Sequence, residues 1–217
     1  MRKFGGILCA LVVLCATAGA QSATITISYT KDAGGSNTNP LNGLAALASF
    51  ESSGDQLSIL LQNTSTGLPM DFSTADSLLV SLGFNLPAGI HIVSGNTAVI
   101  GPGSTGLSQW SSRGSGDSVS EEWAWTNSGG GDLLNVYKQV ISTSAGNQGQ
   151  TRFGGGTGTV AGPFDGIAAS PPLASIPGTQ RAVSNSILFG LTLSSGLTEA
   201  QLHDMAHDSI VEYGSDG

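Results

Sequence analysis

The most regular feature of this chain is the alternation of apolar and polar residues over short segments. Residues 23–30 read ATITISYT, residues 78–86 carry an apolar side chain at every second position, and residues 187–193 repeat that pattern. A period of two in segments rich in β-branched residues is typical of strands with one buried face. Shorter apolar segments predict further strands at 44–51, 57–62, 122–126 and 209–213.

Turn-forming residues divide these segments. The tripeptide SGN at 94–96 lies between two apolar stretches and predicts a β-hairpin spanning residues 90–100. Residues 133–141 fit either a short helix capped by Asp132 or a strand. The segment 144–181 consists mostly of Gly, Pro, Ser and Thr, so we expect a long loop or several short edge segments there.

One short helix is expected near the C-terminal end of the chain. Thr198 and Gln201 have the spacing of a capping box, and Leu202, Met205 and Ala206 give the following residues an apolar side. Together with many short strands and Gly-rich turns, this helix indicates an all-β fold. We expect an antiparallel β-sandwich or jelly roll with one short C-terminal helix.

The first twenty residues have the composition of a secretory signal peptide. Arg2 and Lys3 precede an apolar run over residues 4–16, and small residues at 18–20 form a cleavage site. The apolar run is too short for a membrane span. We therefore expect residues 1–20 to be removed and residues 21–217 to form one domain that is secreted or displayed at the cell surface.

Composition narrows the possible partners and chemistry. The 217 residues include 32 glycines, and the formal net charge is −8. Nucleic acids and anionic membrane surfaces are bound mainly through Lys and Arg, so the acidic balance disfavours both. Cys9 and Cys15 both lie in the leader, so disulfides and thiolate chemistry are not expected in the exported domain.

A first candidate site lies on the expected helix. Glu199, His203 and His207 follow each other at intervals of four residues, which places them on one helical face. The segment from His203 to His207 differs by one methylene group from the zinc-protease helix motif, because Asp204 stands where that motif has Glu. An exposed helix with polar residues facing solvent explains the same pattern without a metal.

A second candidate site involves the three tryptophans. Trp123 and Trp125 share one face of a predicted strand with Glu121, and Trp110 lies a short distance upstream. Flat indoles beside a carboxylate can stack on sugar rings while the acid accepts hydroxyl hydrogen bonds. Strand alternation alone also explains Trp123 and Trp125 as core residues.

The acidic residues leave two further possibilities open. Glycoside hydrolysis needs two carboxyl groups held across a cleft, which the adjacent Glu121 and Glu122 cannot provide together. Glu51, Asp132 or Asp165 are possible partners, but the sequence singles out none of them. No cofactor is required by any motif, although the oxygen-rich loops 32–39 and 127–132 could hold calcium. Turn formation by Asn, Asp and Gly accounts for these loops equally well.

The leader, the Thr/Ser-rich segment 23–30, the stripe SLLVSLGFNLP at 77–87 and the Gly/Ser-rich loops together suggest a family. In these features the chain resembles exosortase-dependent (PEP-CTERM type) bacterial surface proteins. Residues 212–217 contain none of the Pro-Glu-Pro signal, apolar helix and basic cluster that end such proteins, so sorting by that route is not implied. The resemblance implies an extracellular or matrix-associated role and assigns no catalytic residue.

Two functional hypotheses follow. The first is a non-enzymatic secreted or cell-surface β-sandwich with a structural, adhesive or glycan-contacting role, whose partners are extracellular polysaccharide or cell-surface components. The alternative is an extracellular hydrolase, either glycan-active or metal-dependent. The hypotheses differ in whether Trp110, Glu121 and a distant acid or histidine line one exposed concavity.

Overall fold

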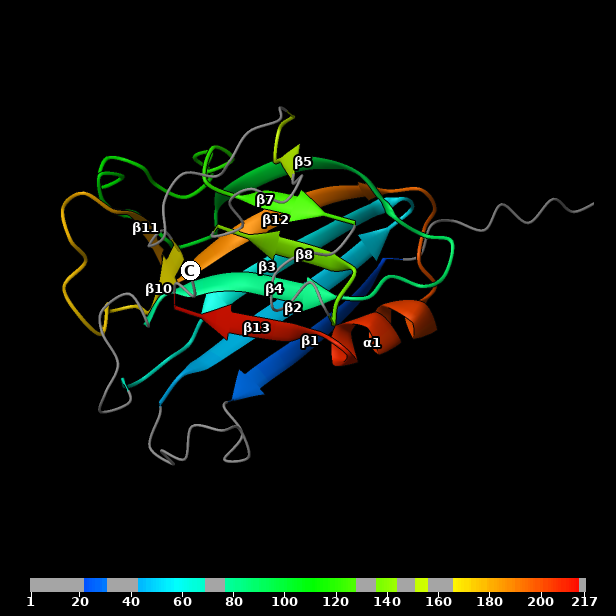
Figure 1. Ribbon diagram of the computed structural model, residues 1–217, viewed down its shortest axis with the longest axis horizontal. Coiled ribbons are helices and arrows are strands. Elements are labelled where there is room, and N and C mark those ends of the chain that lie inside the picture. The colour runs from blue at the N-terminus through cyan, green and yellow to red at the C-terminus, as the bar shows by residue number, and fades with distance from the viewer. Residues whose placement is uncertain are drawn as a thin grey trace, which may run out of the picture.

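Two β-sheets packed face to face make up the fold (Figure 1). The computed structural model describes residues 22–30, 43–68, 77–127, 136–143, 151–155 and 166–214. Over these residues the chain is all-β with a single short α-helix, as the sequence predicted. No helix in these ranges is long and apolar enough to cross a membrane.

The first sheet, sheet A, has five strands, and every neighbouring pair is antiparallel. Its burial pattern alternates strictly along β2 and β3, which confirms the predicted half-buried strands. The strand of sheet A that comes last in the sequence, β12, occupies an inner position between β3 and β5. In spatial order the strands are β1 (Ala23–Thr30), β2 (Ala45–Ser53), β3 (Gln56–Asn63), β12 (Ser186–Leu193) and β5 (Ile92–Ile100).

The second sheet, sheet B, is built from shorter strands. All its pairs are antiparallel except β10 with β11, which run parallel and depart from the fully antiparallel expectation. The additional strand β13 pairs with β4. In spatial order the strands are β6 (Gly106–Ser108), β11 (Arg181–Ser184), β10 (Gly166–Ala168), β4 (Leu79–Phe84), β8 (Gln139–Ser142), β7 (Ala124–Thr126) and β9 (Thr151–Arg152), with β13 at Ile210–Tyr213.

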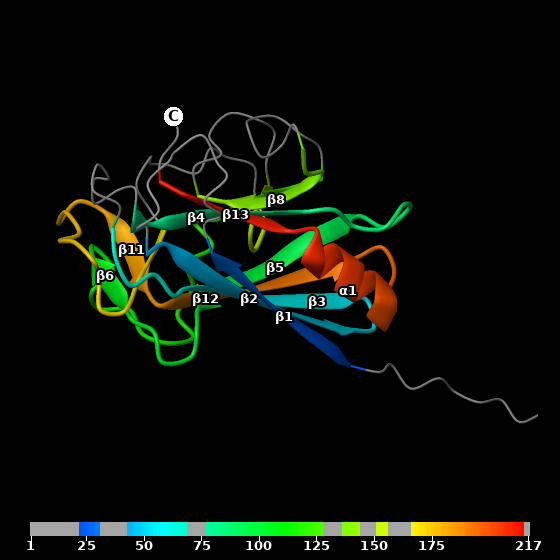
Figure 2. The same ribbon diagram turned by 90° about the horizontal axis from the view of Figure 1, so that it is seen from below.

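The main core fills the space between the two sheets (Figure 2). Its largest side chains are aromatic: Phe50 meets Phe84 edge to face, and Phe189 contacts Trp123 and Phe153. Strand β4 is buried on both faces: Leu79, Leu82 and Phe84 belong to the main core, whereas Val80, with Leu78 just before the strand, belongs to a second small cluster. The predicted alternating stripe at 78–86 is therefore divided between two clusters. The double burial explains why apolar residues also occur between the alternating positions of this segment, as Leu79 does.

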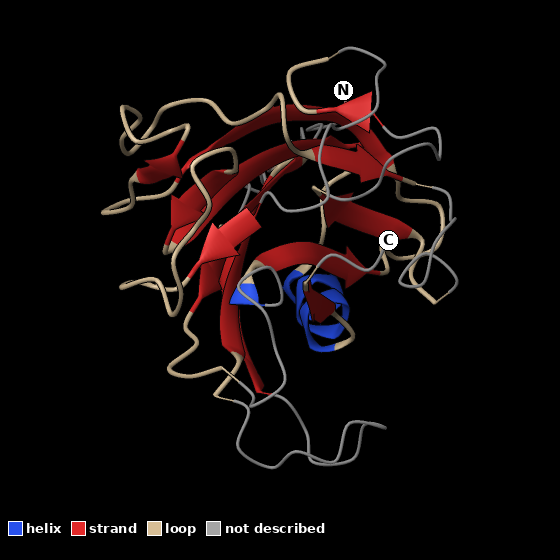
Figure 3. Cartoon of the chain, turned by 60° about the vertical axis from the view of Figure 1, so that its left-hand side comes forward, coloured by secondary structure: helices blue, strands red, loops and turns tan. Residues whose placement is uncertain are grey.

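Helix α1 (Glu199–His207) closes the sandwich beside β1 (Figure 3). The predicted capping box is present: the Gln201 backbone N–H donates to Thr198 Oγ1, and the Thr198 N–H donates to Gln201 Oε1 at 2.9 Å. The apolar side of the helix is buried in the main core through Leu202, Met205 and Ala206.

The predicted hairpin over residues 90–100 is wrong. Residues 94–96 lie inside one continuous strand, β5, which pairs along its length with β12. Register shifts between Gly190 and Leu191 and between Thr192 and Leu193 accommodate the irregular SGN segment as bulges. Gly95 is buried there because an aromatic side chain from the opposite sheet occupies the space beside its Cα.

The structure answers part of the question for the other two segments whose structure the sequence left open, 133–141 and 144–181. Within 133–141 the described residues form strand β8 from Gln139 onward, whereas Asp132 and residues 133–135 lie outside the described residues. The segment 144–181 contributes the short strands β9 and β10. The strand expected at 122–126 begins only at Ala124, because Glu122 still belongs to the preceding turn and Trp123 lies between that turn and the strand.

Candidate functional site

The three tryptophans proposed as sugar-stacking residues are core residues. Trp110, Trp123 and Trp125 are 4%, 1% and 8% exposed. The Trp123 ring lies 4.9 Å from that of Phe189, deep between the sheets. No indole face of the three is therefore open to a glycan, and the core interpretation of strand alternation holds.

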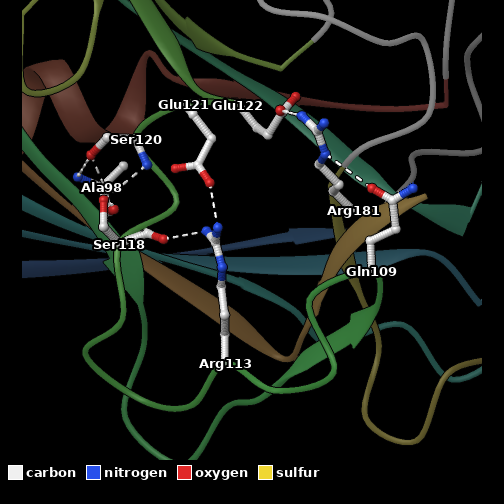
Figure 4. A network of polar contacts seen from close by, with 8 residues as sticks. All are labelled: Ala98, Gln109, Arg113, Ser118, Ser120, Glu121, Glu122 and Arg181. Atoms are coloured by element: carbon white, nitrogen blue, oxygen red, sulfur yellow. Dashed lines mark hydrogen bonds and ion pairs between the residues drawn. The ribbon is translucent and has the colours of Figure 1, made fainter. Parts of the chain in front are cut away.

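Glu121, the carboxylate expected beside them, forms an ion pair with Arg113 (Figure 4). Arg113 Nη2 lies 2.5 Å from Glu121 Oε1, and Nη1 donates to the Ser118 carbonyl at 2.6 Å. The same guanidinium sits 4.6 Å above the Trp110 ring, a cation–π contact. Burial raises the pKa of Glu121, but the hydrogen bond and positive charge of Arg113 outweigh it, so the pKa lies below its ordinary value. Glu121 is held as an anion.

Glu122 points away from its neighbour and pairs with a different arginine, Arg181 of β11. Its carboxylate is almost fully buried, with the side chain 2% exposed. Arg181 also donates from Nε to Gln109 Oε1 at 3.3 Å, so the pair joins the turn before β7 to β11 and to the turn after β6 (Figure 4). Glu121 and Glu122 thus serve two separate ion pairs and do not converge on one point.

The predicted metal centre on the helix does not assemble. The rings of His203 and His207 lie against one another in a tilted arrangement with centroids 4.3 Å apart, and His203 Nδ1 lies 3.5 Å from Asp204 Oδ1. Within the described part of the chain, no three His, Cys, Asp or Glu side chains are grouped so as to hold a metal ion. Glu199, His203 and His207 share a helical face as predicted, but they gather no further ligand because that face borders solvent.

The calcium hypothesis falls largely on residues outside the described ranges. Residues 32–39, residues 128–132 and Asp165 all lie outside the described ranges. Asn127, the described member of the second loop, uses both ends of its amide on β5. It accepts from the Ile92 N–H at 2.9 Å and donates to the Ile92 carbonyl at 2.6 Å. The Asn127 side chain therefore connects its segment to β5 through both hydrogen bonds.

The outer surface of sheet A forms a different candidate site. The outward side chains of its five strands are hydroxyls and amides around an aliphatic row, in which Leu60 pairs with Leu188 and Leu188 with Val99. Glu51 is the one charged residue in these strands. All strand residues concerned are described and at least partly exposed. We call this surface the polar face; it comprises Thr24, Thr26, Ser28, Ser49, Gln56, Ser58, Asn96, Thr97 and Thr192.

Hydrogen bonds between side chains order one end of the polar face. Thr192 Oγ1 accepts from Asn96 Nδ2 at 2.8 Å and from Gln56 Nε2 at 3.2 Å. Asn96 Oδ1 in turn accepts from Ser94 Oγ at 2.7 Å. Toward the other edge, Thr26 and Ser49 share a hydrogen bond of 2.9 Å. These bonds hold the polar groups in fixed positions across neighbouring strands.

Sequence reasoning missed the polar face for a specific reason. The polar half of each alternating strand was visible, but the order of the strands was not. Gln56 and Thr192 become neighbours only because β12 pairs with β3, which brings together residues far apart in the chain. Only the near absence of charge in the alternating segments could have pointed to this surface.

The chain is thus defined as an all-β protein of two packed sheets with one short helix. Comparison with models of protein families, with curated proteins and with solved structures found no match.

Proposed function

We propose that this chain is an exported, non-enzymatic β-sandwich protein that contacts extracellular polysaccharide or cell-surface components through its polar face. The observation that carries the proposal is the composition of that face: each of the five strands contributes hydroxyl or amide side chains, and the strands contain a single carboxylate. Export is supported by the leader-like composition of residues 1–20.

The chemistry of the polar face suits a neutral sugar polymer. Ser and Thr hydroxyls both donate and accept hydrogen bonds, and Asn and Gln amides do the same, so they match sugar hydroxyls in either direction. Outward residues on a sheet recur about every 6.8 Å along a strand and about every 4.8 Å across strands. A regular array of this kind favours a ligand that also repeats.

The placement of the acids supports a non-enzymatic role. A glycosidase needs one carboxyl group with a raised pKa and a second across a cleft. Glu121 instead has a lowered pKa, and Glu122 is buried in an ion pair. Glu121 is paired within the segment between β6 and β7, and Glu122 joins that segment to β11.

The proposal is tested by co-sedimentation of the exported protein with insoluble neutral polysaccharides such as cellulose and chitin. Thr192→Val removes a hydroxyl that accepts two hydrogen bonds, and we expect affinity to fall about fivefold, since one hydrogen bond contributes about 1 kcal/mol. Ser112→Ala, at an exposed serine outside the polar face, is the matched control.

Two results would overturn this proposal. One is equal binding, or equal absence of binding, by the wild type, Thr192→Val and Ser112→Ala on every neutral polymer tried. The other is release of reducing sugar from the same polymers by the wild type, which would favour the hydrolase hypothesis. Mass spectrometry of the exported chain checks the leader, because an intact Met1 would contradict its removal.

A further inference from the structure

The two edges of sheet A are protected to very different degrees. At one edge, β5 is covered by residues 116–120: the Val119 N–H donates to the Ala98 carbonyl at 2.8 Å, and the Ile100 N–H donates to the Asp117 carbonyl at 2.9 Å. Ser120 adds side-chain contacts to Ala98 (Figure 4). The bulges of β5 protect it further, since irregular edges resist pairing with another chain.

The opposite edge, β1, has neither a bonded loop nor a bulge within the described ranges, although helix α1 packs beside it. Its eight residues pair with β2 without a register shift, and the strand contains no charge, proline or glycine. Within the described ranges, β2 is the only strand that pairs with β1, and no loop forms a backbone hydrogen bond to it. Long regular edges without charge or proline are the ones that pair with a strand of another chain.

We propose that β1 pairs antiparallel with β1 of a second copy of this chain, with Thr26 opposite Thr26 across a two-fold axis. Opposite residues of an antiparallel pair lie on the same side of the sheet. This register places hydroxyls together on the outer side and aliphatic or aromatic side chains together on the inner side. The further pairs are Thr24 with Ser28, Ile25 with Ile27, and Ala23 with Tyr29.

The occupant is a second copy because β1 is complementary to itself: in an antiparallel pair with its own copy, hydroxyl residues face hydroxyl residues and apolar residues face apolar residues. Hydroxyl residues at 24, 26 and 28 alternate with apolar residues at 23, 25, 27 and 29, so the strand read backwards presents the same pattern. Cross-strand Thr pairs and β-branched pairs each stabilise antiparallel sheets. The chain as a whole carries a net charge of −8, but this edge contributes no charge to oppose the contact.

Such pairing joins the two copies of sheet A into one continuous sheet, and their polar faces lie on the same side of it. The contact is formed by one strand from each copy, so its area is at the low end for specific interfaces and the dimer is expected to depend on concentration. The inference concerns the edge alone and holds whatever the polar face binds.

Sedimentation velocity over a range of concentrations tests the pairing on the exported chain, with Cys9→Ser and Cys15→Ser introduced so that any retained leader carries no thiol. We expect a concentration-dependent dimer. Thr26→Lys places two like charges opposite each other and should raise the dimer dissociation constant at least about tenfold. Ser49→Lys, one strand inward on the same face, loses the same Thr26–Ser49 hydrogen bond and should leave the dimer intact.

A single introduced cysteine gives a second readout that does not depend on the stability of a charged variant. Thr26→Cys should cross-link two chains on mild oxidation, since opposite Cβ atoms lie about 5 Å apart. Thr24→Cys should not, because the two copies of position 24 are offset by about 13 Å along the strands. A monomer at all concentrations, equal cross-linking by the two variants, or a dimer insensitive to Thr26→Lys would overturn the proposal. Capture of a strand from a different protein without self-association would also overturn it.

Discussion

The indole of Trp125 lies directly against the backbone of Gly95. A Cβ atom at position 95 would come within 2.3 Å of Trp125 Nε1 and within 2.9 Å of Phe153 Cδ1. The contact joins β7 in sheet B to β5 in sheet A, so the absence of a side chain at one position sets how closely the two sheets approach. Glycine is required here by the space that the indole fills.

Gly95→Ala should therefore destabilise the protein. Overpacking a tight core contact costs about 1–3 kcal/mol, and we expect a loss of about 2 kcal/mol in the free energy of unfolding. Urea unfolding followed by tryptophan fluorescence measures it, because all three tryptophans are buried. Gly178→Ala is the control, since nothing lies within 4 Å of its added Cβ. Equal stability of the two variants would contradict the role given to Gly95.

The two ion pairs of Figure 4 should differ in their contribution to stability. Removing one partner of a buried pair leaves an uncompensated charge and costs about 3–5 kcal/mol, whereas an exposed pair contributes about 0–1 kcal/mol. Because the Arg181 side chain is 40% exposed, we expect Arg181→Met to cost about 3 kcal/mol, at the lower end of that range. Arg113→Met, at the more exposed pair with Glu121, should cost about 1 kcal/mol or less. Denaturant unfolding of both variants tests the order, and a larger loss for Arg113→Met would contradict it.

Two tyrosines make the protein sensitive to alkaline pH. Burial raises the pKa of Tyr29 and of Tyr213 from 10.0 to about 12. In the unfolded chain both phenols ionise near pH 10, while in the folded protein they remain protonated. Their contribution to stability is therefore complete below about pH 10 and is lost between about pH 10 and 12, by up to about 3 kcal/mol for each tyrosine.

The double variant Tyr29→Phe/Tyr213→Phe checks this dependence. It should be less stable than the wild type at neutral pH, because the phenol contacts with Ser209 and Ser65 are lost. Its stability should nevertheless fall less steeply over the alkaline range, as measured by urea midpoints at a series of pH values. A variant whose stability falls as steeply as that of the wild type would show that other groups cause the alkaline loss.

The capping box of α1 offers a local test. Thr198→Ala removes the hydroxyl that accepts from the Gln201 N–H, and loss of such a cap costs about 1 kcal/mol. Thr198→Ser keeps the hydroxyl and should retain most of the stability. Similar thermal midpoints for Thr198→Ala and the wild type would indicate that core packing of Leu202 and Met205 alone holds the helix.

Local patterns in the sequence predicted local structure well. Alternation located β1, β3 and β12 because each strand has one face in the core, and the capping box located α1 because its two partners are three residues apart. The SGN segment was misread as a turn because the partner that explains Gly95, the indole of Trp125, lies thirty residues further along the chain.

The contacts of the candidate site residues could not be predicted from local patterns, because their partners lie further away in the sequence. The adjacent residues Glu121 and Glu122 pair with Arg113, in the segment between β6 and β7, and with Arg181 of β11. The helix residues His203 and His207 were placed on one face, but whether a third ligand approaches that face depends on the packing of the whole sandwich. Spacing along the chain specifies which residues share an element and leaves open what lies opposite them.

The inner position of β12 also bears on how the chain is made. During synthesis β1, β2 and β3 emerge first and β5 follows, but the strand that joins β3 to β5 comes only with residues 186–193. Until then sheet A consists of two pieces with unpaired edges, and exposed edges of this kind promote aggregation of nascent chains. A fragment that ends before residue 186 would therefore leave β3 and β5 without the strand that pairs with both, so sheet A is completed only when about the last sixth of the chain has been translated.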